Sequence, residues 1–334
     1  MSAFADAEVI RAATTQFVPV AADDWYQRRR QDAEGEFFRA VADRLGRRGE
    51  GGATRQGVYV FTAAGTPLAF KNSGGSAADT RALLADGLQK FAALPAAERT
   101  PGGVAPPAPE APDADLARTP PPGGLVVKTF TRILDHLDGR YCKGACGAVG
   151  GDKAARDHLW ITADEVRALA PAKTAVGFRY AMPEKVATRL ARFHLVDNTR
   201  GEPAAWERGQ VRAKRFTLRV VAATAEAVDL QLDGEAVMTT DRDPATAARG
   251  FAARLAGDLR YRPATGTFDR FDLVAVGEAW GDQADMQAAR PGRSLLGVVF
   301  ELARDGPGDR IPPQAARDPG AYFGRDRWPS RLRF

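Results

Sequence analysis

The sequence predicts an α+β protein with two domains, the second built on an antiparallel β-meander in a sandwich or an open barrel. Three observations lead to this class. A chain of 334 residues is longer than a single hydrophobic core usually supports. A stretch rich in proline, alanine and glycine divides it at residues 96–124, and apolar residues recur at helical spacing before that stretch but alternate near the end. We therefore assign residues 1–95 and 125–334 to the two domains.

The first domain is predicted to alternate helices with short strands. Phe37, Val41 and Leu45 recur at i, i+4 and i+8, which indicates one buried face of a helix. GVYVF and PLAF flank the turn TAAGT, a pattern typical of a β-hairpin. In chain order we expect a helix at 6–15, a buried strand at 17–21 (FVPVA), a mostly helical stretch at 25–48, the hairpin at 57–70 and an amphipathic helix at 79–94.

This order resembles the thioredoxin fold over about residues 5–95. DAEVIRAATTQFVPV stands where such domains continue after the redox helix, and GVYVFTAAGTPLAF stands where they carry a strand, a turn and a second strand. The segment departs from the family because it holds no cysteine, shows no opening strand, and has Gln56-Gly57 where a cis-proline is usual. The resemblance implies a degenerate thioredoxin-like α/β domain that lacks the Cys-x-x-Cys motif and dithiol exchange. The alternative is another small α/β layer structure.

Residues 96–124 are predicted to be a linker. The run APPAPEAPDADLARTPPPGG is of low complexity and holds too few large apolar side chains to bury a core. We expect it to be extended or disordered in large part.

The second domain is predicted to open with a helical segment that carries the cysteines and histidines, at 125–205. Residues 125–137 (LVVKTFTRILDHL) fit either a strand running into a helix or a single helix. Thr162 and Glu165 form a capping box that starts a helix ending near Ala170. Met182-Pro183 begins another helix.

Period-two alternation predicts an antiparallel sheet at 211–303. Phe216, Leu218 and Val220 alternate with polar neighbours, and four further runs repeat the pattern between turns such as ATGT at 264–267. An extended tail at 304–334 is expected to wrap the domain. This half resembles parts of uncharacterised bacterial proteins, a resemblance that implies no activity.

Both cysteines and all three histidines fall within residues 135–200. Cys142 and Cys146 form a Cys-x3-Cys pair, and thiolates with imidazoles suit Cu(I) or Zn. Together with His158 and His194 they would give a four-ligand site, whereas His136 has no obvious ligand geometry. The pair with a distant histidine resembles the copper ligands of thioredoxin-fold copper chaperones, although here it lies outside the thioredoxin-like segment. We therefore expect a soft-metal-binding or thiol-redox protein.

Two alternatives stay open at this point. The first is a non-catalytic binding or scaffolding protein whose cysteines are structural. The second is a hydrolase or transferase in which Cys142 or Cys146 is the nucleophile, with His158 or His194 as the base. In that case Asp197 or Asn198 would orient the imidazole, and Lys143 would lower the pKa of a thiol.

Other polar groups carry weaker signals. The loop RFHLVDNTRGEPAAW at 192–206 is dense in polar side chains, as binding loops often are. Asp269, Asp272, Glu278 and Asp282 form an acidic series near Trp280 that is typical of a solvated sheet face. The sequence holds no Gly-rich phosphate loop, His-Glu-x-x-His motif or serine nucleophile elbow.

Charge and hydropathy limit the kinds of partner that the sequence predicts. A net charge of +5 carries no specific nucleic-acid signature, although the basic tail FGRDRWPSRLRF could contact an anionic partner. No apolar run approaches the roughly 20 residues of a membrane span, and residues 1–17 lack the apolar core of a signal peptide. We expect a cytoplasmic chain as given, or an extracytoplasmic one if a leader was trimmed.

Overall fold

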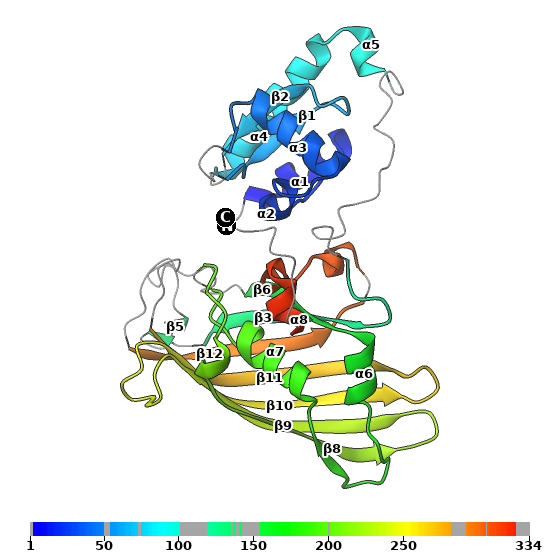
Figure 1. Cartoon of the computed structure of the whole chain (residues 1–334). Helices are drawn as coiled ribbons and strands as arrows, with labels where there is room; N and C mark the ends of the chain where they lie inside the picture. The colour runs from blue at the N-terminus through cyan, green and yellow to red at the C-terminus, as the bar shows by residue number, and fades with distance from the viewer. Residues whose placement is uncertain are drawn as a thin grey trace. The chain divides into compact units, whose positions relative to one another are not determined.

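The computed structural model describes residues 3–49, 54–72, 75–100, 119–134, 136–137, 140–141, 154–199, 201–281, 292–304 and 306–324. Internal contacts divide the chain into two units, Met1–Arg118 and Thr119–Phe334 (Figure 1). Each unit has a hydrophobic core of its own.

The first unit packs helices around a two-stranded sheet. Its elements are the 3-10 helix η1 (Ala3–Ala5), α1 (Ala7–Gln16), α2 (Asp24–Gln27), α3 (Ala33–Arg44), the antiparallel strands β1 (Val58–Phe61) and β2 (Pro67–Lys71), α4 (Ala77–Ala93) and α5 (Ala96–Arg99). Side chains of Asp6, Asp32 and Ser76 accept hydrogen bonds from the first turns of α1, α3 and α4. Val9 of α1, Val60 of β1 and Leu84 of α4 meet in the core. The predicted hairpin and the predicted helix at 79–94 are confirmed.

The predicted buried strand at 17–21 is wrong. This segment has no regular structure, and Val18 and Val20 are 89% and 79% exposed. An apolar run becomes a buried strand only where a neighbouring strand pairs with it, and Pro19 has no N–H to offer such a neighbour. The helical stretch at 25–48 is also interrupted, because Asp32 caps a new helix. The likeness to a thioredoxin-like domain stays a prediction, since the sheet described here has two strands.

The second unit is organised around an open eight-stranded antiparallel sheet, which confirms the α+β class and the meander (Figure 1). The spatial order is β6-β3-β12-β11-β10-β9-β8-β7. The strands are β3 (Leu125–Ile133), β6 (Ala155–Ile161), β7 (Arg179–Ala181), β8 (Val211–Ala223), β9 (Val228–Thr239), β10 (Gly250–Arg262), β11 (Thr267–Trp280) and β12 (Arg293–Leu302). Strands β4 (His136–Leu137) and β5 (Arg140–Tyr141) pair separately. The sheet does not close, and helices rather than a second sheet cover its core face.

The covering layer consists of short helices. They are α6 (Ala163–Leu169), α7 (Glu184–Arg189), the π-helical turn η3 (Leu190–His194), α8 (Pro319–Phe323) and the 3-10 helices η4 (Arg208–Gln210), η5 (Pro307–Arg310) and η6 (Gln314–Arg317). Helices α6 and α7 lie across one face of the sheet, and α8 lies near its β6 edge (Figure 1). Leu190 of η3 and Leu169 of α6 are fully buried with sheet residues such as Leu218.

Two predicted segments of this unit need correction. Residues 125–205 are not chiefly helical, because they contribute β3, β6 and β7 to the sheet; the side chains of β3 alternate strictly between buried and half-buried. The tail is not simply extended, since residues 307–323 form η5, η6 and α8, with Tyr322 buried. The capping box of Thr162 and Glu165 is confirmed at the start of α6. The basic end of the tail, 325–334, lies outside the described residues.

Candidate functional site

Of the residues predicted to bind a metal, His158 and His194 are described, whereas Cys142, Cys146 and Lys143 lie outside the described residues. His158 lies on β6 and His194 ends the π-helical turn η3, where Leu195 N–H bonds to the carbonyl of Leu190. Both imidazoles are buried. They lie close enough together for a charge on His158 to lower the pKa of His194. No group of three His, Cys, Asp or Glu side chains converges among the described residues.

A buried ion pair holds the helical layer to the C-terminal segment. Arg189 of α7 is 2% exposed and meets both carboxylate oxygens of Glu165 at 2.6 Å. It also donates to the carbonyls of Tyr322 and Trp160. Burial raises the pKa of Glu165, but the hydrogen bonds and charge of Arg189 outweigh it and lower that pKa below its ordinary value. These hydrogen bonds of Arg189 thus join α7 to α6, β6 and α8.

Tyr322 connects this ion pair to His194. Its hydroxyl accepts a hydrogen bond from Trp160 N–H at 3.1 Å and lies 2.9 Å from Nε2 of His194. The hydroxyl has one proton and can accept more than one hydrogen bond, so it can accept from Trp160 and donate to Nε2 at once. In that arrangement the proton of a neutral His194 is on Nδ1, which lies 3.7 Å from Oδ2 of Asp157. That separation is longer than a hydrogen bond.

Burial sets the protonation of this pair. It lowers the pKa of His194 to about 3, with help from the charges of Arg189 and His158. It also raises the pKa of Asp157 to about 6, against the backbone amides of Gln314 and His158 and the charge of Arg317. At neutral pH the imidazole is therefore neutral and the carboxylate ionised, so the contact is not an ion pair. Burial likewise lowers the pKa of His158.

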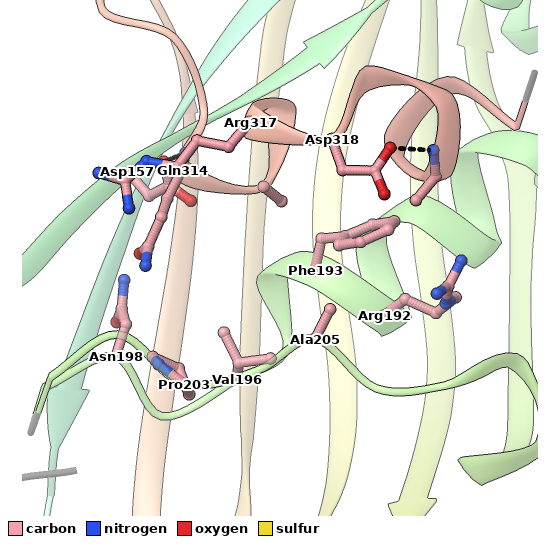
Figure 2. A pocket seen from close by; sticks show the side chains of 12 residues that line it. Asp157, Arg192, Phe193, Val196, Asn198, Pro203, Ala205, Gln314, Arg317 and Asp318 are labelled. Carbon is pink, nitrogen blue, oxygen red and sulfur yellow. Dashed lines mark hydrogen bonds between the residues drawn. The ribbon is translucent and has the colours of Figure 1, made fainter. Parts of the chain in front are cut away.

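Asp157 lines a cleft of about 360 Å³ between the 196–205 loop and the C-terminal segment (Figure 2). Its volume falls within the range of small-molecule sites. One wall carries Val196, Asn198, Pro203 and Ala205, and the other carries Gln314, Ala315, Arg317, Asp318 and Ala321, with Arg192 and Phe193 between them.

Both walls are held in place by hydrogen bonds. Trp206 donates from its backbone to the carbonyl of Arg192 and from its indole to that of Leu195. Asp197 turns the loop by accepting from the backbone and hydroxyl of Thr199. Opposite, Gln314 N–H donates to Oδ1 of Asp157 at 3.0 Å. The cleft is thus formed by fixed elements.

The two ends of the cleft differ from its middle. Asp157, Asn198, Gln314 and Arg317 make a polar end, and Arg192 and Asp318 lie at the other end (Figure 2). The apolar middle is formed by Phe193, Val196, Ala205 and neighbouring alanines. At the polar end, Oδ1 of Asn198 is buried and has no hydrogen-bond partner in the described part of the chain. Nδ1 of His194 is likewise buried without a hydrogen-bond partner in the described part of the chain.

Two signals from the sequence have different outcomes. The polar loop at 192–206 forms one wall of the cleft. The acidic series lies on the sheet instead: Asp269, Asp272 and Glu278 pair with Arg262, Arg270 and Arg293, and Asp282 is outside the described residues. Sequence reasoning missed Asp157, Arg189, Gln314 and Tyr322. Only the helix signals around Tyr322, Asp318-Pro319 at the start and Gly324 after the end, were visible.

Comparisons with known proteins identify no relative of this chain. No family model, curated protein or solved structure matches this chain. None of the helices in the described ranges has the length and apolar character needed to cross a bilayer.

Proposed function

We propose that the second unit is a non-catalytic module that binds a small molecule in the cleft beside Asp157. One observation carries the proposal: Asn198 lines the cleft, and its Oδ1 is buried without a hydrogen-bond partner among the described residues. Leaving a buried acceptor unpaired costs about 1–3 kcal/mol, so such groups usually have a reason. A ligand would reach this oxygen after a small rotation of the half-buried Asn198 side chain, and a hydrogen bond donated to it would then remove that cost.

The surroundings support binding. The cleft combines an apolar middle with a few fixed polar groups, which is the usual make-up of a ligand site. The π-helical turn that carries Phe193 and His194 also fits, since such turns recur at functional sites.

The test is a fragment screen by protein-observed NMR on the isotope-labelled full chain. We expect fragments to shift the backbone amides of Phe193, Asn198 and Gln314. Ala205→Trp fills the cleft and should abolish these shifts, whereas Ala172→Trp, at an exposed position, should leave them unchanged. If no fragment shifts the amides that line the cleft, or if Ala205→Trp does not reduce the shifts while remaining folded, the proposal is wrong.

The soft-metal or thiol-redox hypothesis is our second proposal. It is supported by the clustering of Cys142, Cys146, His158 and His194 in the sequence. His194 would have to release Tyr322 or turn from Asp157 to bind a metal. The test is the copper and zinc content after loading and dialysis, compared with the Cys142→Ser/Cys146→Ser variant. Equal content in both proteins would contradict it.

A further inference from the structure

We propose that the polar end of the cleft binds a primary ammonium group, carried by a ligand with an apolar body. This rests on the proposed binding function and names the chemistry of the ligand. Two residues of the lining determine it: Asp157 carries a carboxylate, and Asn198 carries a buried Oδ1 without a hydrogen-bond partner among the described residues. An ammonium group offers three donors and one positive charge, so it can serve both side chains and neutralise the carboxylate.

Asp157 is held as an acceptor. Its Oδ1 is fixed by Gln314 N–H at 3.0 Å, and the amide of His158 also donates to the carboxylate. Nδ1 of His194 lies 3.7 Å from Oδ2, too far for a hydrogen bond. The side chain is thus positioned by its neighbours, and a carboxylate has enough acceptor sites to take a further hydrogen bond from a ligand.

The charges around Asp157 favour a cation over an anion. The titratable and charged groups that face it are His194 from η3, His158 beside it on β6, and Arg317 from η6. Both imidazoles are buried, and burial disfavours their charged forms. Arg317 is paired with Glu202 at 2.8 Å, which offsets its charge.

The apolar middle of the cleft determines the chemistry of the rest of the ligand. Phe193 is 7% exposed and Ala205 and Val196 continue the apolar surface beside it. Arg192 stacks on the Phe193 ring at 4.7 Å. A short aliphatic or aromatic body would cover the apolar surface that remains.

Three probes of one shape separate the possibilities: benzylamine, benzyl alcohol and benzoate, titrated against the full chain by NMR at pH 7.5. We expect benzylamine to shift the amides of Asn198 and Gln314 and to bind about tenfold or more tightly than benzoate, the size expected for a charge-assisted hydrogen bond. Asp157→Asn should weaken benzylamine about tenfold. Asp233→Asn makes the same chemical change at an exposed site on β9 and should change nothing.

Each outcome of these titrations supports or contradicts the ammonium proposal. Benzylamine binding that survives Asp157→Asn overturns the proposal, as does benzoate or benzyl alcohol binding equally well. If fragments bind in the cleft and none of the three probes does, the ammonium proposal is also wrong, while the binding function stands. If neither the probes nor the fragments shift the amides of the cleft, both proposals fall. For Asp157→Asn, an unchanged spectrum away from the cleft separates lost binding from lost folding.

Discussion

Removing the hydroxyl of Tyr322 tests the buried network directly. Tyr322→Phe keeps the ring, which packs 5.3 Å from Phe193 and 5.0 Å from the Arg189 guanidinium. It deletes the oxygen that accepts from Trp160 N–H and that lies 2.9 Å from Nε2 of His194. Because Trp160 and His194 are 1% and 3% exposed, water cannot replace the hydroxyl without a change in packing.

The expected cost follows from these two groups. Each buried polar atom left unpaired costs about 1–3 kcal/mol, so the loss of both partners should lower the free energy of unfolding of the second unit by about 2–6 kcal/mol. The control is Tyr180→Phe, which removes one hydrogen bond donated to the carbonyl of Leu169 and should cost about 0.5–1.5 kcal/mol.

Urea unfolding followed by tryptophan fluorescence measures both variants, and hydrogen exchange at the Trp160 amide isolates the local effect. This amide should exchange faster in Tyr322→Phe and at the wild-type rate in Tyr180→Phe. If Tyr322→Phe loses less than about 0.5 kcal/mol, or no more than Tyr180→Phe, the network does not stabilise the protein as argued.

Three other predictions concern stability. Arg189→Met strands the buried Glu165 carboxylate and should cost about 3–5 kcal/mol by urea unfolding, whereas Arg189→Met/Glu165→Leu should recover most of that loss; equal losses would contradict the ion-pair argument. His194 has a lowered pKa, so the unfolded chain binds its proton first and stability falls as pH drops from about 6.5 toward 3. Asp157 has a raised pKa, so its protonation opposes this loss between about pH 6 and 4; Asp157→Asn should therefore make the urea midpoint fall more steeply there, and parallel curves would refute it. Val18→Ser and Val20→Ser should change the free energy of unfolding by less than about 0.5 kcal/mol, whereas Val9→Ala should lower it by more than about 1 kcal/mol. A large loss of stability in Val18→Ser would mean that Val18 is buried.

The sheet was predictable where its pattern is local. In β8 to β12 the alternation of buried and exposed side chains follows from period two alone, because successive strands pair with their neighbours in sequence. The α6 capping box is equally local. Strand β6 was missed because ARDHLWI places buried His158 beside an aspartate, and because β3, the strand that pairs with it in the described part of the chain, precedes the Cys segment in the sequence. The same dependence on a partner explains the error at 17–21.

The candidate site was predictable only in part. The polar loop at 192–206 and the two buried histidines drew attention by composition and clustering. Tyr322 reaches His194 across 128 residues of sequence, and Gln314 reaches Asp157 across 157. No periodicity or spacing encodes such contacts, because they depend on how the C-terminal segment packs on the sheet.

The strand order has a consequence for synthesis of the protein. Strand β3 pairs with β6 and with β12, so residues near Ile133 find their second partner only at Leu296 and beyond. The β3–β6 pair emerges from the ribosome early, yet its other edge stays unpaired until the meander is complete. Such distant pairing closes a long loop and slows folding. A nascent chain that ends before β12 would leave that edge of β3 unpaired, and an exposed strand edge is a template for aggregation.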